Sequence, residues 1–397
     1  MFFSVLSIIF IKVRINVKWE QHKLGDFGNV QMNKRIFKSQ TLDSGDVPFY
    51  KIGTFGKKAD AYISSELYEE YRNKYPYPKD GDLLISASGS IGKIVEYKGQ
   101  RAYYQDSNIV WLDHDNRILN LFLKAFFQIV KWNGTEGSTI KRLYNKNILN
   151  TEIILPKIKE QTAIGKLIEK FDYLITLQQR KLEQLKQLKK ALLQQLFVDK
   201  NSKLPILRFK NFNGDWKKRK LRELGKIVTG NTPKTSQIEN YNNNGIPWIT
   251  PTDIYSTYTT NSSKHLSNIG KERARVAPAN SLLITCIASI GKNTLIFQES
   301  AFNQQINALI PHNNDSSFLL AESNKWSQIM TNLAGQTSMQ IINKKDFSEI
   351  LTEIPDLSEQ KIIGSLFTKL NLFITLQQSK IDQLTILKKY LLQKLFI

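Results

Sequence analysis

The sequence predicts an α+β protein with two tandem α/β domains, each followed by a long helix, and the two helices packed on each other. The first observation is an internal duplication, because residues 161–197 return as residues 360–396 at a constant shift of 199 positions. The second is helical periodicity in both copies, and the third is a set of short strand patterns, bounded by turn formers, before each helix. A period this long indicates two copies of a domain, not a solenoid.

The duplicated helix carries an apolar stripe. Apolar residues recur at steps of three and four, the spacing of a coiled-coil seam. Gln178 with Lys181, and Gln377 with Lys380, interrupt the stripe at the same heptad, and polar seam residues can fix register and orientation. The alternative is that each helix packs only on its own domain. The residues predicted to form the seam are Leu167, Phe171, Leu174, Leu185, Leu188, Leu192, Leu366, Leu370, Phe373, Leu384, Leu387 and Leu391.

Composition favours a polyanionic partner. The chain has 397 residues, a formal net charge of +21 and a sequence pI of about 9.7. This excess of Lys and Arg favours nucleic acid over an anionic membrane, because the sequence shows no amphipathic anchor or lipidation signal. A basic protein with merely solvated lysines is the alternative. Cys286 is the only cysteine, which excludes an intrachain disulfide and a thiolate metal cluster and is consistent with a reducing cytoplasm. We expect Cys286 to be buried, not nucleophilic.

The first 18 residues are atypical. Residues 2–11 are apolar, but the run is too short for a transmembrane helix and lacks the features of a secretory signal. Trp19 pairs with Trp216 in the repeat, whereas residues 1–18 do not resemble the segment that precedes Trp216. No function is assigned to this segment.

A strand and turn recur in the two globular parts. Residues 81–86 lead into the turn SGSIGK at 88–93, and residues 280–285 lead into ASIGK at 288–292. A nucleotide P-loop is excluded, because Ala87 and Cys286 replace the required first glycine, and Ile94 and Asn293 replace the required Ser or Thr. A turn that offers backbone N–H groups and one lysine to a nucleic-acid phosphate stays possible, beside a plain β-turn with a solvated lysine. Its candidates are Ser88, Ser90, Lys93, Ser289 and Lys292.

Polar side chains near these turns are further DNA-binding candidates. Gln105 pairs with Gln304 in the repeat, and glutamine can contact adenine or simply support a turn. Identity between the copies slightly favours the structural role. Residues 51–77 and 250–275 differ most between the halves, and a Gly-rich polar stretch follows in each half. The remaining candidates are Lys51, Ser138, Lys141, Thr250, Thr252, Gln336 and Ser338.

An enzyme needs a catalytic set, and none is evident. His22, His114, His265 and His312 lack metal-ligand spacing. Asp356, Glu359 and Lys361 superficially resemble a metal-dependent nuclease motif, but Lys157 and Thr162 replace the Asp and the Lys in the first copy. A capping box of Asp356 and Glu359 at the start of the helix explains them better.

The sequence resembles the specificity subunit of type I restriction-modification systems. The resemblance rests on the half-length duplication, on LPILRF at 204–209 leading to NGDW at 213–216, and on residues 355–364 before a leucine-rich helix. It covers about residues 19–397. The chain departs from the pattern at its N-terminus, where no copy of LPILRF precedes Trp19.

The resemblance implies a division of the chain. It predicts an atypical segment (1–18), target recognition domain 1 (19–155), conserved helical region 1 (156–200), target recognition domain 2 (201–354) and conserved helical region 2 (355–397), with the helical regions packed antiparallel. It implies a non-catalytic subunit that reads a bipartite site on double-stranded DNA and docks type I methyltransferase subunits, two of them expected, and a restriction translocase subunit. S-adenosylmethionine, ATP and Mg²⁺ would belong to those partners, with no cofactor or metal in this chain.

Two other functions stay open from the sequence. A coiled-coil scaffold would use the helices for assembly alone, and a non-specific DNA-binding protein would use the charge without reading bases. The basic charge and the aromatic, Gly-rich loops argue against a scaffold, and salt-dependent binding to duplex DNA would separate the readings.

Overall fold

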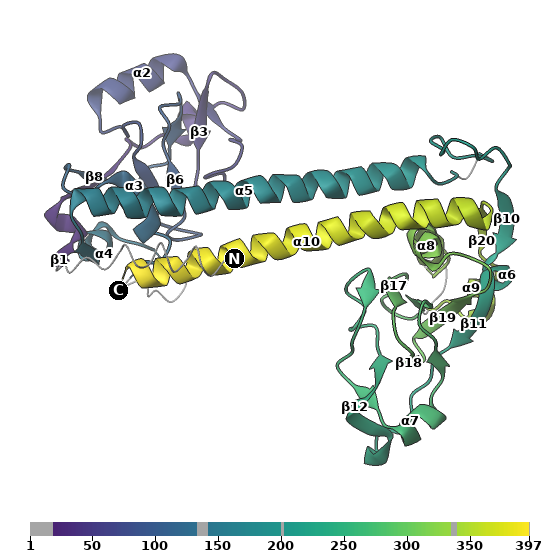
Figure 1. The fold of residues 1–397 in the computed structure, drawn as a ribbon. Helices are drawn as coiled ribbons and strands as arrows, with labels where there is room; N and C mark the ends of the chain where they lie inside the picture. Colours follow the sequence, from purple (N-terminus) through teal and green to yellow (C-terminus); the bar gives the residue numbers. More distant parts are fainter. Residues whose placement is uncertain (1–18, 133–141, 200–201, 335–339, 397) are drawn as a thin grey trace. The chain divides into compact units, whose positions relative to one another are not determined.

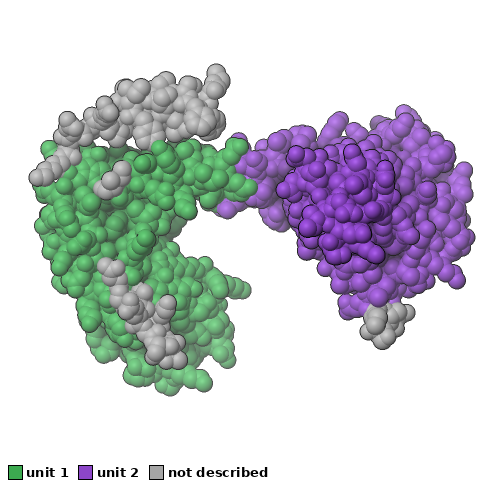
Figure 2. Space-filling view, turned by 90° about the horizontal axis from the view of Figure 1, so that it is seen from below, with its two compact units in different colours: residues 1–177, 381–397 green, residues 178–380 purple. Residues whose placement is uncertain are grey.

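The computed structural model describes residues 19–132, 142–199, 202–334 and 340–396. Its residues separate into two compact units, one of residues 1–177 with 381–397 and one of residues 178–380, coloured in Figure 2. The α+β class and the two domains are confirmed, and the sheets of the two units follow one plan. The atypical segment 1–18 lies outside the described residues.

The described residues of unit 1 form three small sheets (Figure 1). Its central sheet has the order β2-β8-β5-β6, all antiparallel, and buried β5 and β8 supply much of its core. A second sheet has the order β4-β3-β7, with β3 and β7 parallel, and β1 pairs with β9. The elements are β1 (Glu20–Lys23), β2 (Gly28–Met32), β3 (Val47–Tyr50), β4 (Tyr62–Ile63), α2 (Ser65–Lys74), β5 (Leu83–Ser86), β6 (Ile94–Glu96), β7 (Tyr103–Tyr104), β8 (Ile109–His114), α3 (Asn120–Phe126), α4 (Asn145–Leu149) and β9 (Glu152–Leu155).

Unit 2 repeats this plan with additions. Its central sheet, β11-β19-β16-β17-β13, gains one strand, and its second sheet, β14-β12-β18-β15, gains another. The nineteen-residue α8 stands where unit 1 has the seven-residue α3. The elements are β10 (Lys217–Lys220), α6 (Leu221–Leu224), β11 (Gly225–Thr229), β12 (Tyr241–Ile249), β13 (Tyr258–Thr259), β14 (His265–Leu266), α7 (Asn268–Arg273), β15 (Val276–Ala277), β16 (Leu282–Thr285), β17 (Asn293–Ile296), β18 (Ser300–Phe302), β19 (Ile306–Pro311), α8 (Ser316–Ala334), α9 (Lys344–Glu349) and β20 (Leu351–Ile354), which pairs with β10.

The two long helices are α5 (Ile158–Gln195) and α10 (Leu357–Leu395), and they run antiparallel. In unit 1, Ile168 near the start of α5 packs with Leu391 and Leu392 near the end of α10. In unit 2, Phe197, just after α5, packs on Phe367 near the start of α10. The helices therefore contact each other in both units, and packing on the home domain alone is excluded.

The polar interruption of the seam was predicted at Gln178 and Gln377, and these side chains meet. The amide nitrogen of Gln377 donates to Oε1 of Gln178 at 2.8 Å and to its backbone carbonyl at 3.0 Å. Gln377 is buried, so an unmatched amide there would be costly, and this pairing disfavours other registers of the two helices.

Leu167 and Leu387 of the predicted seam pack in the cluster of Ile168 and Leu391, but two other predicted positions face outward. Leu188 and Phe373 are 49% and 57% exposed, so these two assignments are wrong. Leucine spacing alone cannot choose between adjacent apolar positions such as Leu174 and Ile175. Residues that are buried or partly buried at alternating steps of four and three are Ile164, Ile168, Phe171, Ile175, Gln178, Leu182, Leu185, Lys189 and Leu192 on α5, and Ile363, Phe367, Leu370, Ile374, Gln377, Ile381, Leu384, Lys388 and Leu391 on α10.

A glutamine and a glycine, at equivalent positions in the two copies, attach each long helix to its domain. The buried amide of Gln161 donates to the carbonyls of Pro156 and Arg117, each at 3.0 Å, and Gln360 donates to Pro355 at 3.0 Å. Four residues later a glycine, Gly165 or Gly364, lets the helix touch the domain backbone. These contacts fix where each helix leaves its domain.

The predicted capping box at α10 is half correct. Asp356 accepts a hydrogen bond from the backbone N–H of Glu359 at 2.9 Å, as an N-cap does. The carboxylate of Glu359 instead binds the guanidinium of Arg208 through two hydrogen bonds of 2.8 and 2.7 Å. Glu359 is therefore structural, which argues against the nuclease alternative.

Candidate nucleic-acid interface

Each central sheet carries the predicted turn between two antiparallel strands. Turn 1 (residues 87–93) joins β5 to β6, and turn 2 (residues 286–292) joins β16 to β17. The hydroxyl that ends the first strand closes each turn: Ser86 accepts from the N–H of Lys93 at 2.8 Å, and Thr285 accepts from that of Lys292 at 3.0 Å. The two turns are thus the same structure built twice.

Positive φ angles also match between the turns. Gly92 and Gly291 have φ of +79° and +84°, and Gly89 matches Ala288 at +63° and +60°. The left-handed region disfavours alanine, so Ala288 is strained where Gly89 is not. The turn is retained in unit 2 despite this strain.

Backbone N–H groups of the turns, which the sequence predicted to bind a phosphate, are instead bonded within the fold. The N–H groups of Gly92 and Lys93 bind Ser86, and those of Gly291 and Lys292 bind Thr285. They are not available as a cradle for a phosphate. Ser90 and Ser289 are exposed at the tips of the turns, where side chains can still meet a ligand.

The two turn lysines differ. Nζ of Lys93 donates to the carbonyl of Phe55 at 2.5 Å and lies 5.8 Å from the centre of the Phe55 ring. The ammonium of Lys93 is therefore partly satisfied by contacts within its own domain. The Lys292 side chain is exposed, and its ammonium makes no hydrogen bond or ion pair within the described residues, so it is the more available cation.

In unit 1 the remaining described candidates gather around turn 1. Ser88 donates to Oδ1 of Asn108 at 2.7 Å, and Gln105 accepts from the N–H of Ile52 at 2.9 Å. Gln105 thereby joins the loop after β3 to the strand end, a structural role. Its predicted pairing with Gln304 is wrong, because the N–H of Gln105 binds Tyr50 where the N–H of Asn303 binds Ile249. Lys51 lies in the same loop and pairs with Asp60 at 2.9 Å, partly exposed.

In unit 2 the candidates are more dispersed. Gln304 is exposed and accepts from the hydroxyl of Thr232 at 2.5 Å. Thr250 contacts Thr252 at 2.8 Å and donates to Asp253 at 2.7 Å, so these threonines shape a local turn. Ser138, Lys141, Gln336 and Ser338 lie outside the described residues, and their assignment stays a prediction.

Two exposed or charged side chains beside the turns escaped the sequence analysis. The guanidinium of Arg142 donates to the carbonyl of Ser107 at 2.9 Å, and the backbone of Arg142 forms an isolated antiparallel β-bridge with Ser88. Tyr255 is 85% exposed and lines the same hollow as Lys292. Arg142 follows the Gly-rich stretch directly, and Tyr255 lies in the segment that differs between halves, so position could have suggested both.

Burial also explains the lone cysteine. Cys286, the first residue of turn 2, is 3% exposed, and Asn307 donates to its sulfur at 3.1 Å. Burial raises the pKa of the Cys286 thiol to about 12, so the expectation of an inert cysteine is confirmed.

Over the described ranges, no three His, Cys, Asp and Glu side chains gather where they could hold a metal ion. Within the same ranges, no helix has the length and apolarity needed to cross a bilayer.

Comparison with known proteins points to one family. Residues 16–187 and 213–385 each match the family described as type I restriction modification DNA specificity domain. A putative type I restriction enzyme specificity subunit of Haemophilus influenzae, S.HindORF215P, is 57% identical over 153 residues, which are 38% of this chain and 40% of that protein. The specificity subunit of Escherichia coli EcoR124I/EcoR124II is 30% identical over 41% of this chain and 42% of its own length. These matches span about two fifths of each relative.

Other similarities extend over nearly the whole chain. The putative MjaX specificity subunit of Methanocaldococcus jannaschii is 24% identical over 95% of this chain and 92% of its own length. The crystal structure of a type I restriction-modification S subunit from M. genitalium has a TM-score of 0.65 at 15% identity, over 97% of this chain and 98% of that one. This likeness shows a shared fold.

Proposed function

Because this chain belongs to the type I restriction modification DNA specificity domain family, we propose that it is the DNA-reading subunit of such a complex. One observation carries the proposal: a single strand-turn-strand element is built twice, and the loops around the two turns differ. Two equivalent readers with different contact residues suit a DNA site made of two unlike halves.

The partners follow from the same family. Type I methyltransferase subunits, two of them, would dock on this chain, and a restriction translocase subunit would join them. S-adenosylmethionine, ATP and Mg²⁺ would act in those subunits, and this chain would be non-catalytic. The length of the helical regions would set the gap between the two half-sites, and α5 contacts α10 within each unit.

The decisive experiment is co-expression with the type I methyltransferase subunit encoded beside this chain, followed by mapping of methylated adenines. We expect a split motif with two unlike halves and a constant gap. Methylation without a split motif, or none despite a stable complex, would contradict the two-reader function. Purified chain with Mg²⁺ alone should leave duplex DNA uncut.

A single lysine tests the charge on turn 2. Lys292→Ala should weaken duplex binding and lower the slope of log affinity against log salt by about one, because one phosphate contact is lost. Lys186→Ala, which removes an exposed lysine from α5, is the matched control and should change neither value. Equal effects of both variants would favour the non-specific alternative.

A further inference from the structure

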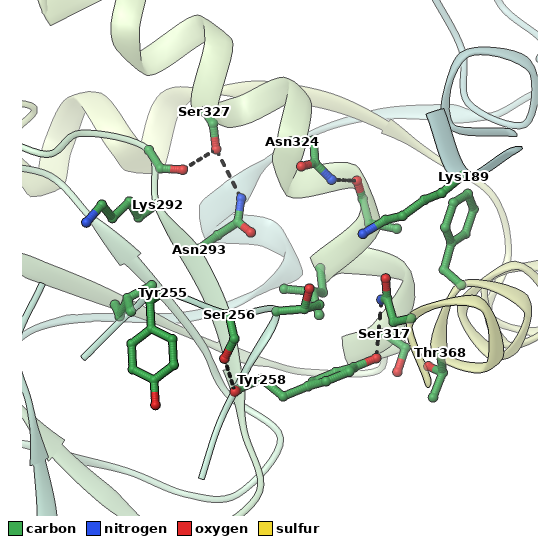
Figure 3. Close-up of a pocket in the computed structure, with 17 residues that line it drawn as sticks. Lys189, Tyr255, Ser256, Tyr258, Lys292, Asn293, Ser317, Asn324, Ser327 and Thr368 are labelled. Carbon is green, nitrogen blue, oxygen red and sulfur yellow. Dashed lines mark hydrogen bonds between the residues drawn. The ribbon is translucent and has the colours of Figure 1, made fainter. Parts of the chain in front are cut away.

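Unit 2 contains a pocket beside the helix seam. This pocket, of about 510 Å³, lies where α8, the start of α10 and the end of α5 meet the loop before β13. Figure 3 shows the Lys189 side chain reaching into it between Asn324 and Tyr258. The hydroxyls of Ser317 and Thr368 line it as well.

The ammonium of Lys189 lies in this pocket, and no carboxylate among the described residues pairs with it. Its side chain is partly buried at the helix seam, and it has no ion pair or hydrogen bond within the described residues. Burial lowers the pKa of the Lys189 ammonium, as expected for an amine taken out of water without a carboxylate beside it.

The duplication supplies an internal reference. The repeat places Lys388 of α10 at the position of Lys189, and Lys388 forms an ion pair with Asp172. That carboxylate also accepts a hydrogen bond of 3.2 Å from Gln128. Unit 1 therefore shows which chemical group this seam lysine binds: a carboxylate.

In unit 2 the lysine is kept but the carboxylate is not. The residue equivalent to Asp172 is Asn371, whose amide lies 3.4 Å from the hydroxyl of Tyr258. Asn371 is neutral, so the charge of Lys189 is left uncompensated from within the unit.

Space for a ligand exists in the same place. The helix starts, Asn120 of α3 and Ser316 of α8, set Phe318 of unit 2 against Phe122 of unit 1. Phe122 is fully buried, and its ring centre lies 5.0 Å from that of Phe396. In unit 2 the ring of Phe318 is equally buried, 5.3 Å from that of Phe197, so a ring fills this position in both units and the space for a ligand is the pocket beside it.

We propose that this pocket binds a carboxylate, with Lys189 as its cationic partner and Asn371 and Tyr258 beside it. The carboxylate belongs either to a small organic acid or to an Asp or Glu side chain of an associated protein. Lys292 and Tyr255 line the outer part of the same pocket, but the inference rests on Lys189 at the helix seam, so a failed methylation experiment leaves it standing.

Malonate, titrated calorimetrically into the full chain at constant ionic strength, tests the first source. We expect one saturable site that Lys189→Met and Asn371→Asp each weaken by about tenfold or more, since the first removes the cation and the second supplies an internal carboxylate. Lys388→Met is the matched control, because it alters the equivalent lysine in unit 1 and should leave malonate binding unchanged.

The affinity of the chain for the methyltransferase subunit tests the second source. Lys189→Met and Asn371→Asp should each weaken assembly by about tenfold, whereas Lys388→Met should not, if an acidic side chain enters the pocket. The proposal is overturned if malonate does not bind and assembly ignores both variants. Phosphate that binds more tightly than malonate, with the same dependence on Lys189, would equally overturn the carboxylate assignment.

Discussion

At the scale of single residues, Glu322 of α8 has a buried carboxyl group whose polar contacts compensate only part of the cost of burial. It is 1% exposed, accepts from the hydroxyl of Thr352 at 2.8 Å, and has Nζ of Lys325 at 3.4 Å from its second oxygen. Burial raises the pKa of Glu322 to about 7, and Lys325 offsets only part of that effect.

The folded state therefore holds the proton of Glu322 more tightly than the unfolded chain does. Its contribution to stability is complete below about pH 4.5, declines as pH rises toward 7, and is lost above that, a change of about 3 kcal/mol. Glu322→Gln should remove this decline, so its stability relative to the natural chain should rise between pH 4.5 and 7 in urea unfolding. Glu272→Gln, at an exposed site on α7, should show no such trend.

Cys286 leads to a kinetic prediction. Because its thiol is buried and its pKa is raised to about 12, a thiol reagent at pH 8 should react with the folded chain only through opening of unit 2. Absorbance after addition of a chromogenic disulfide should show slow labelling that guanidinium makes immediate. Rapid stoichiometric labelling of the folded chain would contradict the buried position.

At the scale of elements, the contact between α10 and its domain depends on Gly364, which has no side chain. A Cβ on Gly364 would lie 2.2 Å from Oδ1 of Asp315 and 2.8 Å from the backbone nitrogen of Phe318. That carboxylate caps α8 by accepting from the N–H of Phe318 at 2.8 Å. Two helices therefore meet at one glycine.

Gly364→Ala should destabilise unit 2 by about 1 to 3 kcal/mol, because overpacking and loss of the cap outweigh the better helix propensity of alanine. Ser365→Ala, on the exposed face of the same turn, is the control and should be close to neutral. Denaturant midpoints of the two variants make the comparison, and a stabilised Gly364→Ala chain would show that the contact is absent.

The helices also show what a sequence can and cannot specify. Internal duplication predicted both helices, both domains and the polar interruption of the seam at Gln178 and Gln377, because these follow from symmetry and spacing. The seam register at Leu188 and Phe373 was wrong, because adjacent apolar positions are interchangeable in a period pattern. The partner of Glu359 was missed, because Arg208 is far away in the sequence and local capping rules do not see it. The same limit applied to the turns, whose N–H groups are used by Ser86 and Thr285.

At the scale of the whole molecule, the division into units crosses the order of the chain. Unit 1 includes residues 381–397, and Leu391 and Leu392 are buried there against Ala125 and Ile168. Ending the chain after Lys380 should therefore open unit 1, while α8 in unit 2 stays protected. Compared with the full chain, the truncated chain should exchange amide hydrogens faster in α3 and at an unchanged rate in α8. A similar acceleration in α8 would show that the two units do not fold separately.

This dependence has a consequence for synthesis on the ribosome. The segment that forms most of unit 1 emerges first, yet the rings of Phe122 and Phe126 must wait for Phe396, whose ring centre lies 5.0 and 6.1 Å from theirs. Unit 2, whose residues are contiguous from 178 to 380, has no such delay. The nascent chain thus completes its second domain before its first, and an early release of the polypeptide would leave an apolar patch for chaperones to cover.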